Sequence, residues 1–270
     1  MMTLGLPLLM RIVRIAKSQN VTSVADFIAS RYGKSSALGA VVTIVAVIGT
    51  LPYIALQLKA IAVSFTIVTG ASADATASAS GAHSSTALLI TLGLFAFAVL
   101  FGTRHVDATE HQRGLMLAIA TESVVKLTAF VVVGLFVVVT FFGSFGALRE
   151  RALANPDVAA VFAQQFDGGL WLTVGFLSFL AMILLPRQFH VAVVENENEA
   201  ELRRAAWVFP IYLVAINLLV VPIAAAGLLT AQPNVDPDFY VLLLPLDSGS
   251  HLITDIAFIG GMSAATAMVI

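Results

Sequence analysis

The stretch LWLTVGFLSFLAMILLPRQFHVAVVEN, residues 170–196, decides how this chain folds. It is apolar and long enough to cross a bilayer, but Pro186 interrupts it shortly before Arg187 and His190. Proline removes one backbone donor and clashes with the carbonyl four residues earlier, that of Met182, so a helix here must bend or break. Two interpretations follow: an ordinary proline kink, or the discontinuous helix with which secondary transporters build ligand sites near the bilayer midplane.

The composition indicates an integral membrane protein. Of the 270 residues, 59% are hydrophobic and 11% are charged, whereas soluble domains carry about 25% charged residues. A net charge of −2 and the lack of a Lys/Arg-rich run give no indication of a nucleic-acid partner. The chain has no cysteine, which excludes disulfides and thiol chemistry.

Apolar segments of spanning length recur along the chain, and a span needs about 20 mainly apolar residues. After an opening half-helix at 3–10, we predict six spans, at 37–69, 86–102, 114–142, 169–194, 205–230 and 251–270. The expected fold class is an all-α, polytopic membrane helix bundle that forms one domain over residues 1–270. Because both ends fall inside apolar runs, we expect a fragment cut from a longer membrane domain.

Lys and Arg are concentrated in alternate connecting loops. Nine of them fall in 11–36, 103–113 and 195–204, whereas the other set of loops holds only Arg149 and Arg151. The positive-inside rule therefore predicts that the first set is cytoplasmic, in a multi-pass protein of the inner (plasma) membrane.

The loops themselves carry local signals. In the first, Thr22 or Ser23 is predicted to cap a short helix with Asp26 in its first turn. Residues 71–85 are Ala/Ser-rich and predicted to be flexible, while 143–168 and 231–250 are long enough to hold short helices over the outer mouth. The run ENENEAELRR, residues 195–204, is predicted to be a solvated connector with Glu–Arg pairs along a helix.

Placing an ionisable side chain inside a membrane span costs about 2.5–3.5 kcal/mol of insertion free energy. Each such residue in this chain therefore needs a structural or functional explanation. Glu122 and Lys126 stand four residues apart on one helix face. They form either a structural ion pair or a carboxylate that binds a cation or proton beside a lysine. His190 is either a hydrogen-bonded structural histidine or a proton carrier. Loss of the Pro186 N–H leaves the Met182 carbonyl available to a ligand or water.

Two further groups of small or polar residues lie in spans. A stripe at helical spacing can line a cavity or form interhelical hydrogen bonds, and it comprises Tyr53, Gln57, Ala60 and Ser64. The last span contains Gly260, Gly261, Ser263 and Thr266. Small residues permit close helix packing, and hydroxyl and free carbonyl oxygens suit a hard monovalent cation.

Four stretches together resemble the sodium/solute symporter family, in the family's order. They are NVTSVADFIASRYG at 20–33, LPYIALQLKAI at 51–61, ATESVVK at 120–126 and LLPRQFHVAVVENENEAELRRAAWVFPIYL at 184–213. The last stretch is most similar to the symporter-like domain at the front of some bacterial sensor histidine kinases. The resemblance implies an inverted-repeat fold of two five-helix bundles, which this chain would enter in the second core helix and leave in the eighth. Residues 170–196 would be the broken sixth.

The resemblance also implies an ion site. The carbonyl of Gly260 and the hydroxyl of Ser263 would hold Na⁺, but Ala264 stands where the family has a second hydroxyl. Glu122 follows Thr121 where some members have a Thr-Asp pair, and it would replace the missing hydroxyl or take a proton instead. The solute pathway is expected to include Tyr53, Gln57, Met182, Arg187 and His190.

We therefore expect cation-coupled uptake of a small organic solute, such as an amino acid or carboxylate, by alternating access. Na⁺ or H⁺ would be the coupling ion, with no other cofactor. The alternative is a membrane sensor whose solute occupancy is read by a kinase domain downstream in the same polypeptide. An enzyme is not expected, because the chain has no HExxH motif, and His105 and His111 flank a cytoplasmic loop without further metal ligands.

Overall fold

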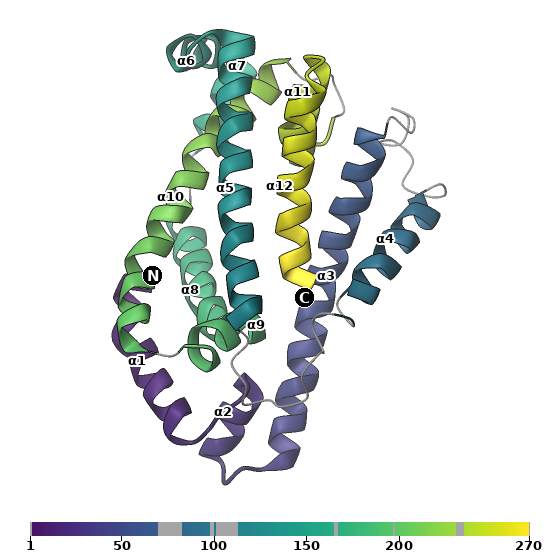
Figure 1. Ribbon diagram of the computed structural model, residues 1–270. Helices are drawn as coiled ribbons and strands as arrows, with labels where there is room; N and C mark the ends of the chain where they lie inside the picture. The colour runs from purple at the N-terminus through teal and green to yellow at the C-terminus, as the bar shows by residue number, and fades with distance from the viewer. Residues whose placement is uncertain are drawn as a thin grey trace. The chain divides into compact units, whose positions relative to one another are not determined.

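The computed structural model describes residues 2–69, 83–97, 100, 113–164, 167–196, 198–230 and 235–269, and these contain helices but no strand (Figure 1). The elements in chain order are α1 Met2–Ser18, α2 Val24–Arg31, α3 Ser36–Val68, α4 His83–Phe97, α5 Arg113–Phe142, α6 Phe145–Ala154, α7 Pro156–Phe162, α8 Gly168–Leu184, α9 Pro186–Phe189, the π-helical η3 His190–Val194, α10 Glu199–Thr230, the 3₁₀-helical η4 Pro237–Phe239, α11 Tyr240–Asp247 and α12 His251–Val269. The all-α prediction is confirmed over this part of the chain.

Membrane-length helices are present where three of the six spans were predicted, and a bent helix pair lies at a fourth. α3, α10 and the stretch Met116–Phe142 of α5 are each long and apolar enough to cross a bilayer, and α8 with Pro186–Val194 would be a fourth if the bent pair is one span. These helices support a membrane protein. The predicted spans at 86–102 and 251–270 are not among them. Residues 98, 99, 101, 102 and 270, and the side chains of 265–269, lie outside the described part of the chain.

The chain divides into two compact units. The first holds Met1–Tyr53, His105–Met116 and Gln165–Leu213, and the second holds Ile54–Arg104, Leu117–Gln164 and Val214–Ile270. The boundaries fall inside α3, α5 and α10, so each of these helices contributes to both units.

In the first unit, α1 is an amphipathic helix that extends well past the predicted half-helix. Its buried side chains Leu9, Val13 and Ala16 recur every three or four residues and form one face. Residues 11–18 are therefore the second half of a helix, which corrects the prediction of a loop over 11–36. The apolar face of α1 explains the difference, because it packs against Phe189 and Val193.

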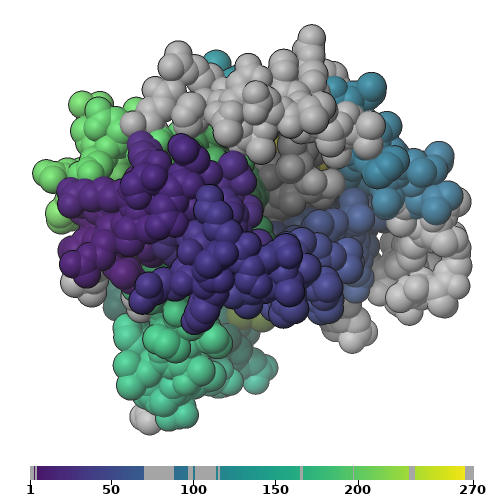
Figure 2. Space-filling model, turned by 90° about the horizontal axis from the view of Figure 1, so that it is seen from below, coloured from purple at the N-terminus to yellow at the C-terminus, as the bar shows by residue number. Residues whose placement is uncertain are grey.

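The short helix predicted after α1 is confirmed as α2, capped by Ser23. The Ser23 Oγ accepts a hydrogen bond of 3.1 Å from the N–H of Asp26, whose carboxylate accepts one of 3.2 Å from the N–H of Thr22. The ring of Phe27 lies 5.6 Å from that of Phe189, so α2 is packed onto α9. In the space-filling view, the purple atoms of α1 and α2 adjoin one another (Figure 2).

The second unit is built around one apolar core. Side chains of α5, α6, α7, α10, α11 and α12 contribute to it, among them Val133, Val137, Leu148, Ala226 and Leu244. The short helices expected in 143–168 and 231–250 are confirmed as α6 with α7, and as η4 with α11. At Gly227 of α10 an added Cβ would collide with the ring of Tyr240, so a glycine there lets α11 approach closely.

The prediction of a solvated connector at 195–204 is wrong for its first residues. The Glu195 side chain is only 5% exposed and Asn196 is 8% exposed. Glu199 accepts two hydrogen bonds, of 2.6 and 2.9 Å, from Arg14 of α1, and it also interacts electrostatically with Arg203, four residues on in the run. Residues 71–82 and 103–112, which include most of the predicted flexible loop and both His105 and His111, lie outside the described residues.

Candidate functional site

The predicted break at Pro186 is confirmed. α8 ends at Leu184, Leu185 takes an extended conformation (φ −64°, ψ 128°), and Pro186 begins α9, with a bend of 57° across the junction. The residue before a proline avoids the helical conformation, and proline itself suits the first position of a helix. Because Pro186 has no N–H, the Met182 carbonyl cannot accept the usual helical hydrogen bond from residue 186.

The chain beyond the break does not return at once to an α-helix. After the four residues of α9 it continues as the π-helical turn η3, where the Glu195 N–H donates to the His190 carbonyl at 2.9 Å. The Phe189 side chain, 1% exposed, and that of Val193, 2% exposed, pack onto the apolar face of α1. Tertiary packing thus stabilises the new direction of the chain.

His190 hydrogen-bonds to a buried carboxylate. Its Nε2 lies 3.2 Å from Oε1 of Glu195, and the histidine side chain is 44% exposed. A hydrogen bond between histidine and a carboxylate fits both interpretations, so the structural histidine and the proton carrier both stay predictions. Sequence reasoning missed Glu195 because residues five apart do not share a face of an α-helix, whereas a π turn brings them together.

Two of the three residues of the expected ion site, Glu122 and Ser263, are in contact between α5 and α12 in the second unit. The Ser263 hydroxyl donates to the main-chain carbonyl of Glu122 at 3.4 Å. One turn earlier on α12, a Cβ added at Gly260 would lie 2.6 Å from the Cβ of Ala129, so the two helices are in close contact there. Oε1 of Glu122 is buried. A carboxylate, a hydroxyl and main-chain carbonyls therefore lie along one helix pair.

These groups suit one kind of ligand. Oxygen atoms with a single negative charge fit a hard monovalent cation or a proton. The hydroxyl of Thr121 donates to the Leu117 carbonyl of its own helix at 2.9 Å, and the Thr121 side chain is exposed. Pairing of Glu122 with Lys126 stays a prediction.

The expected solute-pathway residues fall into two groups. Met182, Arg187 and His190 lie within the first unit around the break, where the Met182 side chain packs against the core and Arg187 is half-buried. Tyr53 and Gln57 lie one turn apart on α3, with Tyr53 44% exposed and Gln57 half-buried. The remaining residues of the α3 stripe, Ala60 and Ser64, are half-buried next to the buried Ile61.

No match is found when the chain is compared with protein-family models, with curated proteins and with solved structures. Among the residues placed by the structure, no group of three or more His, Asp or Glu lies close enough to hold a metal ion. The function is therefore inferred from the residues and geometry above.

Proposed function

We propose that this chain is part of a cation-coupled secondary transporter that carries a small organic solute, such as an amino acid or carboxylate, by alternating access. The observation that carries the proposal is the break at Pro186, a 57° bend within an apolar stretch of spanning length. Main-chain polar groups freed at such a break are stable inside a membrane only against protein or a water-filled cavity. A helix broken in this way supplies the polar atoms with which transporters bind solute at the midplane.

The coupling ion in this proposal binds between α5 and α12. Glu122, Ser263 and the Gly260 carbonyl are its ligands, and the 3.4 Å contact between Ser263 and Glu122 supports this assignment. In the sodium/solute symporters that the quoted stretches resemble, the ion lies between the first and eighth core helices, and some members add an acid on the fifth. By that resemblance α12 would be the eighth core helix and α5 the fifth. The ion is Na⁺, or H⁺ if Glu122 titrates during the cycle.

A second proposal belongs to a different class. The similarity of LPRQFHVAVVEN followed by AAWVFPIYL to the front domain of sensor histidine kinases favours a sensor, whose solute occupancy controls a kinase domain in the same polypeptide. In that case autophosphorylation of the full-length protein changes with solute, whether or not solute accumulates inside vesicles.

The test is gradient-driven accumulation by the full-length protein in proteoliposomes. A panel of radiolabelled amino acids and monocarboxylates is offered under an inward Na⁺ gradient, an inward proton gradient, or neither. The proposal expects at least one compound to accumulate above its external concentration under one ion gradient and to equilibrate without it. If no compound accumulates under either gradient while the protein is folded and correctly inserted, coupled transport is contradicted.

A further inference from the structure

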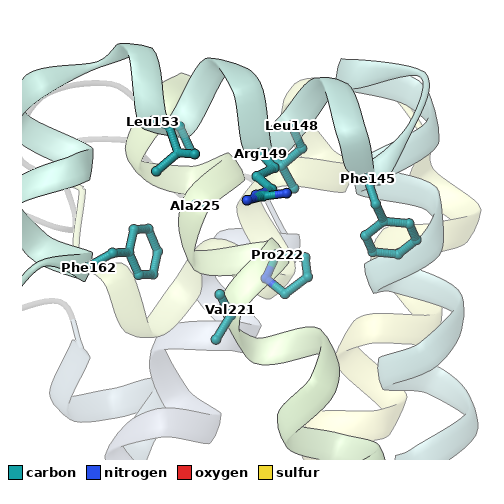
Figure 3. A pocket seen from close by; sticks show the side chains of 9 residues that line it. Phe145, Leu148, Arg149, Leu153, Phe162, Val221, Pro222 and Ala225 are labelled. Carbon is teal, nitrogen blue, oxygen red and sulfur yellow. The ribbon is translucent and has the colours of Figure 1, made fainter.

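An apolar groove lies in the second unit between α6 and α7 on one side and α10 on the other (Figure 3). Its volume is about 300 Å³, at the lower end of the range for small-ligand sites. One wall consists of Phe145, Leu148, Ala152, Leu153 and Phe162, and the other of Val221, Pro222 and Ala225. Arg149 is the one charged residue in the lining.

The groove has a rigid floor and an open rim. Leu148, Ala152 and Ala225 are buried members of the apolar core, so the floor is fixed by packing. The rim residues Leu153 and Val221 are 61% and 56% exposed. The lining combines two small side chains, Ala152 and Ala225, with two aromatic rings, Phe145 and Phe162.

Arg149 is available to a ligand. Within the described ranges no carboxylate pairs with its guanidinium, whereas the guanidinium of Arg151 lies 5.5 Å above the ring of Phe142. Arg149 is on α6, which begins three residues after the last residue of α5, Phe142. The end of a membrane-length helix is where phospholipid head groups lie.

We propose that this groove binds an anionic phospholipid, with one acyl chain along the apolar walls and the phosphate on Arg149. An arginine presents paired donors that match phosphate oxygens. An anionic lipid is favoured over a zwitterionic one because its phosphate carries no ammonium of its own to compete with the guanidinium. A polar solute does not suit these walls, since it would lose hydration without gaining hydrogen bonds. This inference is independent of the transport proposal.

The test measures lipid binding to the purified, delipidated full-length protein by native mass spectrometry. The probes are phosphatidylglycerol and phosphatidylcholine with identical acyl chains, and glycerol phosphate without chains. We expect phosphatidylglycerol to bind in preference to phosphatidylcholine. Arg149→Gln should weaken phosphatidylglycerol binding about tenfold, the size of one charge-assisted hydrogen bond, and remove the preference.

Three further variants test the charge of Arg149 and the shape of the groove separately. Arg151→Gln removes a cation two residues away that does not line the groove, so it should keep the preference. Val221→Trp changes an exposed rim residue, fills the groove, and should weaken both lipids. Arg149→Lys retains the charge but not the paired donors, so it should bind phosphatidylglycerol more weakly than the wild type while keeping part of the preference, which provides the comparison if Arg149→Gln does not fold.

Three results would overturn the proposal. The first is equal phosphatidylglycerol binding by wild type, Arg149→Gln and Val221→Trp. The second is competition by glycerol phosphate as strong as by the lipid, which would indicate a free-phosphate site. The third is a change of oligomeric state in Val221→Trp with lipid binding intact, which would show that a second copy of the chain covers the groove.

Discussion

At the scale of single residues, the hydroxyl of Ser263 contacts α5 at the main-chain carbonyl of Glu122, 3.4 Å away. The motif resemblance implies an ion site that contains this hydroxyl and the Gly260 carbonyl. The structure brings the hydroxyl to Glu122 and places Gly260 against Ala129 of the same helix. The sequence could predict these oxygen atoms but not their proximity, since Glu122 and Ser263 are 141 residues apart. The Glu195 partner of His190 could not be predicted either, because it depends on a π turn with no distinct sequence signal.

Replacement of Ser263 by alanine in the full-length protein should raise the Na⁺ concentration needed for half-maximal uptake about tenfold, because one oxygen ligand is lost. The matched control is Ser178→Ala, since that hydroxyl donates to the Val174 carbonyl of its own helix at 2.7 Å. Uptake assays over a range of Na⁺ concentrations measure the effect. An unchanged Na⁺ dependence in Ser263→Ala would remove this residue from the site.

The core of the second unit leaves no room for a side chain at Gly227. A methyl group there would meet the ring of Tyr240, which is 7% exposed. Gly227→Ala should therefore destabilise the protein by about 1–3 kcal/mol through overpacking. Gly261→Ala is the control, since nothing lies within 4 Å of its added Cβ, and it should be neutral or slightly stabilising. Thermal unfolding in detergent distinguishes them, and equal midpoints for the two variants would contradict the packing at Tyr240.

At the scale of elements, prolines in similar apolar runs have different consequences. α3 continues as one helix of 33 residues through Pro52, while α8 ends just before Pro186. Local propensity does not separate the two, because each proline lacks an N–H and restricts the residue before it. The difference is tertiary: Phe189 and Val193 are buried against α1, and this packing stabilises the bend. The sequence thus located the break, whereas the packing that maintains it required the structure.

An element could be predicted where its signal lies in neighbouring residues of the sequence, and not where it depends on distant ones. The Ser-x-x-Asp cap of α2 was visible in the sequence and is present. The second half of α1 was assigned to a loop because three basic residues lie in it, and its buried face depends on side chains more than 170 positions away. A helix can carry basic residues on one face and apolar residues on the other, so the basic residues of 11–18 do not by themselves indicate a loop.

Pro186→Ala should impair transport more than Pro52→Ala does. Alanine at 186 restores a donor for the Met182 carbonyl and permits a straighter helix, which removes the polar atoms that the proposal needs. Pro52 lies within a continuous helix, so its replacement should leave uptake close to that of the wild type. Initial uptake rates, normalised to protein inserted in the vesicle membrane, provide the measurement. Similar rates in both variants would show that the break has no role in transport.

At the scale of the whole molecule, composition was sufficient to predict a membrane protein, and helices of spanning length support that prediction. The all-helical fold followed from the same apolar runs. The inverted repeat and the side of the membrane on which each loop lies stay predictions, because they depend on relations between segments that composition does not encode. α3, α5 and α10 each contribute residues to both compact units.

The central claim is that the break at Pro186 faces water inside the protein and not the hydrocarbon of the bilayer. The chain contains no cysteine, so single cysteines can be introduced without other changes. Arg187→Cys places a thiol just after the break, and Leu177→Cys places one on the exposed apolar surface of α8.

The decisive measurement is labelling of both variants, in sealed vesicles of either orientation, by a charged thiol reagent that does not cross membranes. We predict that Cys at 187 is labelled and is protected by a transported solute, while Cys at 177 stays unlabelled. No labelling at 187 from either side, in correctly inserted protein, would contradict the account.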